Sequence, residues 1–492
     1  MYQKIRRSLS FTLVLLSAMS HVVCAQSTGS SGRSLQVSVM DRTRVDSWQW
    51  FAAPPASNEY AYVESLLRIA VEQRLKRWDW KLELSQPSIL DAPDNAVGAG
   101  NGQGQLGLGA SYYAANTNSY PAAAFLKQGF VRFTSAKTNL RIGRFEFMDG
   151  TETKPADRTI TWLQQQRIAH RLIGDFGFSN AQRSFDGVDL HSQMGPWNVT
   201  AFAARADQGV FNMNGNPELN VDVQYLALTR SAGSHVLARA FALGFHDGRT
   251  GLTKTDNRSA ALRGADHANT RIGTYGGDLL ASLPAGPGQF DFLFWGAAQN
   301  GSWGVQSHKA GAAAVEGGYQ LSHVATSPWL RGGWFRSTGD ENAADNTHNT
   351  FFQVLPTPRI YARLPFYNQM NSTEEFVQLM DQPMKALSLR SDLHWLELTS
   401  SHDLWYLGGG AFDNKVFGYV GRPANGASSF ASVADVSADW HAVKALDLNF
   451  YYAFAQGKSV IGAIYPSGKN MQYGYVECVY HWSRIHTGGK TK

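Results

Sequence analysis

Arginines and carboxylates recur at short spacing between residues 140 and 190, and their chemistry suits the handling of anions. The segment reads LRIGRFEFMDG, then RLIGDF, then RSFDGVDL. An arginine guanidinium is planar, forked and always charged, so it pairs with carboxylates without requiring a particular protonation state. Rings of such cations lower the barrier for anions that cross a pore and raise it for cations. Nearby acids, such as Asp175, Asp186 and Asp189, can orient the arginines and moderate their attraction.

Short segments with the two-residue periodicity of β-strands carry many of the charges. Leu67, Ile69 and Val71 share one face of such a segment, and Arg68 and Arg74 share the other. The same alternation returns in residues 78–85, 387–395 and 446–454. Two or three charges on one strand face suit a water-filled lumen, and Trp and Tyr near strand ends suit a membrane interface. This pattern favours a membrane barrel over a secreted, soluble β-protein that binds sugars.

The connections between these segments alternate between tight turns and long polar loops. We expect tight turns at residues 76–77, 135–138 and 195–196, and long loops at residues 91–107, 149–180, 247–270 and 339–372. Short periplasmic turns and long extracellular loops are typical of outer-membrane barrels. About 435 residues, at roughly 24 per strand with its connection, correspond to about 18 strands. The sequence therefore predicts an all-β fold, a transmembrane antiparallel β-barrel of about 18 strands.

The N-terminus has the composition of a secretory signal peptide. Lys4 and two arginines precede an apolar run, and small residues precede a cleavage position after Ala25. Cys24 could mark a lipoprotein instead, but the residues before it are not the small ones of a lipobox. After this leader, no apolar run reaches the roughly 18 residues that a membrane helix needs. We expect a signal peptide at 1–25, a lead-in at 26–45, a transmembrane barrel at 46–482 and a C-terminal tail at 483–492.

Three motifs resemble those of the alginate export family of outer-membrane porins. They are the Arg-x-Gly-Arg of residues 141–144, the Arg-x-Phe-Asp-Gly of residues 183–187 and the Thr-Phe-Phe-x-x-x-Pro of residues 350–356. The match is spread over residues 60–482, and it departs from the family at residues 145–147, where a polar Gln-Glu pair is more frequent. The resemblance implies a monomeric 18-stranded barrel with an electropositive, arginine-rich constriction that passes an anionic polysaccharide outward.

The candidate pore lining consists of seven arginines and one carboxylate partner. They are Arg68, Arg74, Arg141, Arg144, Arg171, Arg183, Arg336 and Asp186. Strict alternation cannot place Arg141 and Arg144 on one face unless a bulge intervenes. We expect an anion-selective channel of the Gram-negative outer membrane, exported through the Sec pathway, that passes an alginate-like polyuronate. The alternative is an uptake porin for small acidic sugars or other organic anions. The direction of transport does not follow from the sequence.

Other chemistries have weaker support. The G-x-G-x-x-G of residues 102–107 precedes strand-like residues instead of the helix of a dinucleotide site. Residues 339–349 are rich in oxygen ligands but lack the spacing of a calcium loop. The histidines, including His348, His394 and His402, show no ligand spacing, so we expect no metal and no cofactor.

Catalysis and nucleic-acid binding are also not expected. Ser400 and Ser401 stand beside His402 without an evident third member, so we do not expect an enzyme. A net charge of +5 without clustered basic helices gives no case for nucleic acid. The expected partners are an anionic saccharide, outer-membrane lipid with lipopolysaccharide, and periplasmic secretion components.

Overall fold

The computed structural model describes residues 34–249, 251–357, 359–408 and 420–487. The expected signal peptide, with Cys24 and its cleavage position, lies outside the described residues. One sheet of 19 strands forms the body of the protein, and all of them except the two-residue β16 build the wall of a closed barrel. The expectation of an antiparallel barrel of about 18 strands is confirmed.

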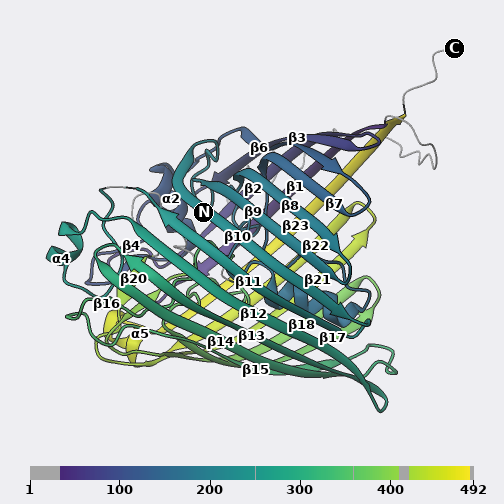
Figure 1. Cartoon of the computed structure of the whole chain (residues 1–492). Helices are drawn as coiled ribbons and strands as arrows, with labels where there is room; N and C mark the ends of the chain where they lie inside the picture. Colours follow the sequence, from purple (N-terminus) through teal and green to yellow (C-terminus); the bar gives the residue numbers. More distant parts are fainter. Residues whose placement is uncertain (1–33, 250, 358, 409–419, 488–492) are drawn as a thin grey trace.

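The wall strands cross the barrel obliquely and pair with their sequence neighbours (Figure 1). They are β1 (Ser34–Gln49), β2 (Glu59–Arg74), β3 (Trp78–Leu90), β6 (Phe125–Thr134), β7 (Thr138–Phe145), β8 (Phe185–Met194), β9 (Trp197–Asp207), β10 (Glu218–Ala232), β11 (Val236–Asp247), β12 (Thr270–Ala285), β13 (Gly288–Trp303), β14 (Gln306–Gln320), β15 (Trp329–Ser337), β17 (Ser372–Met384), β18 (Leu387–Leu398), β21 (Ser429–Val443), β22 (Leu446–Gly457) and β23 (Asn470–Thr487).

The first and last strands close the barrel by pairing with each other. Their register runs from Ser34 opposite Thr487 to Gln49 opposite Gln472. Strand β1 thus begins inside the segment expected as a lead-in, and β23 continues into the segment expected as a tail. In β1, Leu35, Val37 and Val39 already alternate with Ser34, Gln36 and Ser38, so the periodicity extends the strand into the expected lead-in. The end of β23, residues 483–487, is polar except for Ile485 and lacks that signal.

Burial alternates along the strands as the sequence predicts. In β2, Leu66 and Ala70 face the interior and are buried, whereas the outward Ile69 is 42% exposed. In a membrane, such outward apolar side chains contact lipid. The closed barrel can cross the lipid because neighbouring strands satisfy each other's backbone hydrogen bonds. Trp78 and Trp197 are exposed at the first positions of β3 and β9, where they contribute to an aromatic girdle at the tight-turn end.

Short elements lie within the long connections, and Figure 1 shows α4, α5, β16 and β20 gathered together at the loop end of the barrel. The short strands are β4 (Val97–Gly98), β5 (Gly104–Gln105), β16 (Thr347–His348), β19 (Leu404–Tyr406) and β20 (Gly421–Pro423). The helices are α2 (Leu108–Asn116), α3 (Arg158–Leu163), the π-helix η1 (Gln164–Ile168), α4 (Ala260–Ala265) and α5 (Ser459–Ile464). Helix α3 lies inside instead, because its N-cap Asp157 is 3.3 Å from His235 in the tight turn between β10 and β11. Among the described helices, none has the length and apolar character needed to cross a membrane.

The expected turns and loops lie where the alternation placed them, with one difference in local structure. The glycine-rich run of residues 102–107 leads into helix α2, so the expectation of a strand-like segment there is wrong. Alanine and leucine favour helix, and Gly107, with φ of 99°, turns the chain just before it. At the same end of the barrel, β13 and β14 are joined by Gly304 and Val305 alone.

Candidate functional site

Two long connections fold back into the barrel and meet there. They are residues 146–184, between β7 and β8, and residues 338–371, between β15 and β17. The backbone N–H of Gly174 donates to the carbonyl of Leu355 at 2.8 Å, and the N–H of Leu355 donates to Leu172 at 2.9 Å. We call this contact the loop junction. Because Leu172 and Leu355 are fully buried, the junction is a packed element of the fold.

The first inner loop touches walls that lie almost half the circumference apart. Arg44 of β1 donates to the carbonyl of Phe178 in this loop at 3.0 Å. Arg171 of the same loop places its guanidinium 4.8 Å from the ring of Trp295 on β13. Contacts with both walls require the loop to lie inside the barrel. The interior is therefore narrowed by protein in this part of the lumen.

Arg68 faces the interior and connects the wall with the first inner loop. Its guanidinium forms ion pairs with Glu83 of β3 and with Glu146, the latter at 2.9 Å. It also donates to the side chain of Gln182 at 2.9 Å. Arg68 thus points to the interior side of β2, with two carboxylates balancing its charge.

Arg141 and Arg144 lie on opposite faces of β7. Arg141 points inward, pairs with Asp189 at 2.8 Å and lies 4.1 Å from the ring of Phe145. Arg144 shares the outward face with Ile142, and its Nε donates to Asp186 at 2.8 Å. The pairing of β7 with β8 has no bulge to rotate the strand, so alternation separates the two arginines. We leave Arg144 and Asp186 out of the lining that we propose.

Arg171 and Arg183 are buried inside the loops instead of lining open space. Arg171 donates to the carbonyl of Arg167 at 3.0 Å and 2.8 Å. Arg183 donates to the carbonyls of Gly174 at 2.9 Å and Leu355 at 2.8 Å, one on each side of the loop junction. Arg183 is therefore placed to hold the two inner loops together.

The two remaining candidates lie away from the inner loops. Arg74 is at the tight-turn end of β2, where its side chain is 72% exposed and 3.3 Å from Glu72. Arg336 is exposed on the outward face of β15, in phase with Trp334. The inward arginine of that strand is Arg331, which is fully buried and pairs with Asp291 at 3.0 Å. The alternation of apolar residues in β15 could have identified Arg331.

A group of basic and aromatic side chains, here called the inner basic wall, lies on the inward side of the seam between β1 and β23. Its members are Arg42 and Arg44 of β1, Tyr451 of β22, Tyr475 of β23, and Arg359 and Arg363 of the second inner loop. Arg44 is buried and pairs with Glu64 at 2.7 Å and with Asp46 at 2.9 Å. Arg42 lies 3.7 Å from Glu477. These carboxylates fix both strand arginines in position.

Arg359 differs from the other arginines of this wall. Its guanidinium lies 3.5 Å from the ring centroid of Phe178, and Arg44 covers the same ring at 3.8 Å. It donates to the carbonyl of Arg363 at 2.8 Å and to the hydroxyl of Tyr475 at 3.4 Å. Among the described residues no carboxylate lies within ion-pair distance of Arg359. Its charge is held in place without being neutralised.

Sequence reasoning missed this wall for two reasons. Arg42 and Arg44 lie in the segment expected as a lead-in, although their spacing with Asp46 puts all three on one strand face. Arg359 and Arg363 lie in a loop, where no periodicity indicates which way a side chain points. The wall is assembled by the closure of the barrel and by the inward fold of the loop.

Two carboxylates of the first inner loop, Asp175 and Asp149, have shifted pKa values. Burial alone would raise the pKa of Asp175, yet the hydrogen bond and charge of His170, 3.3 Å away, lower it to about 2. The same contact raises the pKa of His170 against the effect of its own burial. Burial raises the pKa of Asp149 to about 6, although Arg239 opposes the shift. Asp149 accepts the backbone N–H groups of Leu172 and Ile173 beside the loop junction.

The acidic residues near 340 belong to the second inner loop, and they are hydrogen-bonded to the serine and histidine near 400 in the connection that follows β18. The hydroxyl of Ser400 donates to the carbonyl of Asp340 at 2.9 Å, whereas the ring of His402 lies 3.3 Å from Glu341. The Asp340 carboxylate accepts the N–H of Asn342. In this described region the serine hydroxyl and the histidine ring have separate partners.

The fold resembles that of solved outer-membrane porins. OccAB2 of Acinetobacter baumannii shares 10% identity at a TM-score of 0.55, covering 91% of this chain and 98% of that one. OccK2 (OpdF) of Pseudomonas aeruginosa, solved in complex with glucuronate, shares 9% identity at a TM-score of 0.54, with coverage of 91% and 98%. OprD of Pseudomonas aeruginosa shares 10% identity at a TM-score of 0.53, with coverage of 92% and 94%. Similarity at this level of identity concerns the fold.

The sequence itself gives a more specific result. A search of curated proteins finds no match. The family model described as Alginate export matches residues 114–463, which include both inner loops and most of the wall strands. With its closed barrel and this match over most of its length, the chain is an outer-membrane porin that belongs to the alginate export family.

Proposed function

We propose that this outer-membrane channel passes acidic saccharides of the uronate type and that the inner basic wall contacts their carboxylates. The first candidate cargo is an alginate-like polyuronate, because the chain belongs to the alginate export family. Each uronate unit carries one carboxylate, and arginine is the side chain best suited to pair with that group.

The position of Arg359 is the observation that carries this proposal. Most lumenal arginines are already matched by carboxylates, as Arg44 is by Glu64 and Asp46. Among the described residues, Arg359 donates to a carbonyl and a tyrosine hydroxyl and lies over aromatic rings, with no carboxylate within 4.0 Å. Its positive charge can therefore attract a passing carboxylate without first breaking an ion pair. A single such site also keeps binding weak enough for release.

The aromatic residues of the wall suit a sugar ring beside that carboxylate. Tyr475 lies 5.3 Å from Tyr451 between ring centroids in a stacked arrangement. The hydroxyl of Tyr451 is engaged by Asp435 at 2.8 Å, and that of Tyr475 accepts from Arg359. Tyr475 can still donate its hydroxyl hydrogen to a saccharide oxygen.

The second candidate is a pore for small acidic sugars, which the loop junction favours. The backbone contact of Gly174 with Leu355 joins two loops across the lumen and narrows the path. One similar porin, OccK2 (OpdF), was solved with glucuronate bound. Polymer and monomer would use the same carboxylate chemistry and differ in the width that the inner loops must leave open.

The remaining features of the proposal concern the surroundings of the channel. We propose a monomer, embedded in lipid and lipopolysaccharide, that is exported through the Sec pathway and that selects anions without catalysing a reaction. For a polymer cargo, periplasmic secretion components would deliver the chain to the tight-turn end of the barrel.

Single-channel recording in planar bilayers tests the proposal. We expect a reversal potential that indicates anion preference, and current block by oligouronates but not by neutral sugars of equal length. Arg359→Gln should raise the half-blocking uronate concentration about tenfold or more, because a hydrogen bond to a charged group contributes about 1.5–3 kcal/mol. Glucuronate and oligouronates of increasing length would separate the two candidate cargoes.

Arg74→Gln is the matched control, since Arg74 is exposed at the tight-turn end. It should leave uronate block unchanged. Cation preference in the wild type, or equal block of wild type and Arg359→Gln by uronates, would contradict the proposed role of the wall.

A further inference from the structure

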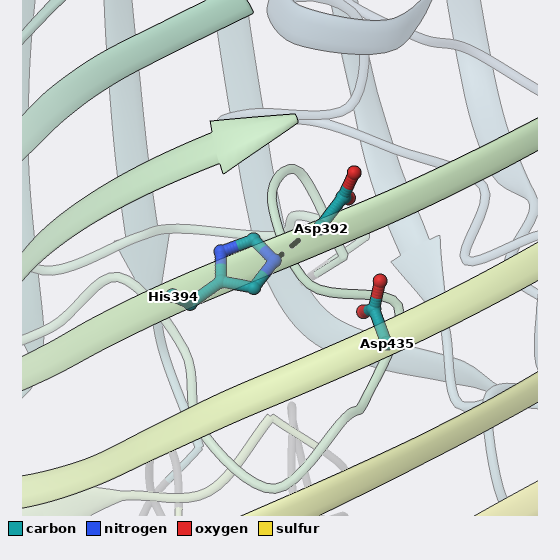
Figure 2. A group of neighbouring side chains, drawn as sticks. All are labelled: Asp392, His394 and Asp435. Atoms are coloured by element: carbon teal, nitrogen blue, oxygen red, sulfur yellow. Dashed lines mark ion pairs between the residues drawn. The ribbon is translucent and has the colours of Figure 1, made fainter. Parts of the chain in front are cut away.

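A compact group of potential metal ligands lies in the interior wall between β18 and β21. Asp392 and His394 are two residues apart on the inward face of β18, and Asp435 is the direct cross-strand partner of Asp392 on β21. All three side chains are buried. Figure 2 shows the imidazole and both carboxylates turned toward a common space between the two strands. One donor atom from each residue lies within 4.8 Å of the other two.

Two of these buried side chains have unsatisfied atoms. Oδ1 of Asp392 and Nε2 of His394 have no hydrogen-bond partner. The Asp392 residue and the His394 residue are each only 1% exposed, so bulk water does not satisfy them. A buried polar atom without a partner costs about 1–3 kcal/mol, which a ligand bound between these two atoms would recover.

The tautomer of His394 follows from its other ring nitrogen. Nδ1 lies 2.9 Å from Oε1 of Glu374 on β17, and Oε1 also accepts from the hydroxyl of Tyr367 at 2.8 Å. A carboxylate can only accept, so Nδ1 carries the hydrogen. In the neutral ring, Nε2 therefore presents a lone pair toward Asp392. A carboxylate that orients a histidine in this way is the usual outer support of a metal-bound imidazole.

Two species could occupy the space: a proton on Nε2 or a cation. A proton would form a hydrogen bond, but the nearest carboxylate oxygen, Oδ2 of Asp392, is 3.8 Å from Nε2. A cation needs no such contact, because ligand atoms around a zinc ion lie about 2.0–2.2 Å from the metal and can stand well apart from one another. Two ligands of a tetrahedral zinc ion lie about 3.5 Å apart, close to the 3.8 Å between Nε2 and Oδ2, and the three donor atoms lie within 4.8 Å of one another.

The other hydrogen bonds of the two carboxylates leave one oxygen of each unused. Oδ2 of Asp392 accepts from Arg390 and, at 3.1 Å, from Gln378. Oδ2 of Asp435 accepts from the hydroxyl of Tyr451 and from the backbone N–H of Arg363. The opposite oxygen of each carboxylate stays available to a metal, and Arg390 already holds one of these carboxylates in position.

We propose that Asp392, His394 and Asp435 bind one divalent transition-metal ion, with Zn²⁺ as the expected occupant. One imidazole and two carboxylates form a donor set that zinc accepts, and a fourth position stays open to water or to a saccharide oxygen. The spacing of residues along the chain does not reveal this site, because its third ligand comes from another strand.

The site would also stabilise the second inner loop. Arg390, which holds Asp392, donates to the carbonyl of Tyr361 at 2.6 Å, and Asp435 accepts the N–H of Arg363. Both loop residues belong to the segment that carries Arg359. A metal that fixes Asp392 and Asp435 would therefore fix the part of the loop that faces the inner basic wall.

Zinc binding to the detergent-purified full-length protein tests the site directly, without any measurement of transport. After chelator treatment, calorimetric titration with Zn²⁺ should give one site per chain. His394→Gln and Asp435→Asn should each weaken that binding at least a hundredfold, and Glu374→Gln should weaken it about 10- to 100-fold. His308→Gln is the matched control, since His308 is also buried and inward but lies on β14.

Titrations should use a His441→Gln background, because His441 lies 2.6 Å from Asp447 on the exposed rim and could bind zinc itself. Heat-dependent mobility on gels would confirm that each variant folds. In crystals soaked with Zn²⁺, an anomalous peak between His394, Asp392 and Asp435 would establish the site even if a variant fails to fold. Absence of that peak, or equal affinity of folded His394→Gln and wild type, would overturn the proposal.

Discussion

Arginines and carboxylates pair on both faces of the barrel, at the inner basic wall and at an outer charged row near the extracellular ends of β7 to β12. The outer charged row follows consecutive partner positions across six strands: Arg144, Asp186, Arg205, Asp222, His246 and Arg271. Inside, the side chain of Arg44 is 0% exposed beside Glu64; outside, that of Arg205 is 41% exposed beside Asp222.

The difference in burial gives the same ion pair two different consequences. A buried charge that loses its partner is strongly destabilising, whereas an exposed pair competes with water and salt and contributes little. The inner pairs therefore define the shape of the lumen. The outer pairs form a polar row at the loop ends of β7 to β12, and we expect them to have little influence on the fold.

Removing the cation from an inner pair should have the largest effect. Arg44→Ala leaves Glu64 and Asp46 buried without their cation, and we expect the free energy of unfolding to fall by about 3–5 kcal/mol. Urea unfolding of the reconstituted protein, followed by tryptophan fluorescence, measures it. Arg336→Ala, on the exposed outward face of β15, is the control, and an equal loss in both variants would remove the distinction between the faces.

Separating the two inner loops should have the next largest effect. Arg183→Ala removes the donors to Gly174 and Leu355, and we expect a loss of about 2 kcal/mol at the loop junction. Open-channel noise should rise and protease should cleave the inner loops sooner, while ion preference stays unchanged. A shifted reversal potential with quiet, protease-resistant loops would instead assign Arg183 to the selectivity filter.

The pH dependence of the first inner loop should be comparable or smaller, because it rests on the single pair of His170 and Asp175. The pKa of Asp175 is lowered to about 2, so its contribution is complete above about pH 4 and is lost as pH falls through 2. The pKa of His170 is raised, so its contribution is complete below about pH 6.5 and is lost as pH rises above the folded value.

The contribution of this pair should therefore be greatest between about pH 4 and 6.5, and the loop should become more sensitive to protease in alkaline buffer. Asp175→Asn should flatten this profile. A wild-type profile that shows no loss of protection from pH 6 to pH 10 would contradict the role of the pair.

A substitution in the outer charged row should change the free energy of unfolding least. Arg205→Gln breaks an exposed pair with Asp222, and we expect unfolding to change by less than about 1 kcal/mol with no change in uronate block. The same unfolding and bilayer measurements apply. A large loss of stability would contradict this prediction, because it would show that the pair of Arg205 and Asp222 behaves as a buried ion pair.

The sequence predicts the wall strands of the barrel, but it does not predict how the two inner loops fill the interior. Alternation of Leu67, Ile69 and Val71 with Arg68 identifies a wall strand, because a strand in a closed barrel has one lipid face and one lumenal face. The same alternation, continued along β15, puts Arg331 on the inward face and Arg336 on the outward face. It gives no information on residues 146–184 or 338–371, whose direction is set by contacts between segments far apart in the chain.

The candidate site shows that limit most clearly. Of the expected lining, Arg68 and Arg141 face the lumen, Arg171 and Arg183 are buried in a loop, and Arg144 and Arg336 face outward. The inner basic wall combines the first strand with a loop that begins some three hundred residues later. Such a juxtaposition depends on tertiary pairing and has no local periodic signal.

The pairing of β1 with β23 has a consequence for biogenesis. Partners such as Ser34 and Thr487 are separated by almost the whole chain, so this seam carries a large loop-closure entropy and can form only after every other strand is present. Until then β1 and β23 are free edges that could pair with other molecules. A chain truncated before Asn470 would retain such edges, and we expect it to aggregate in the periplasm before it reaches the membrane.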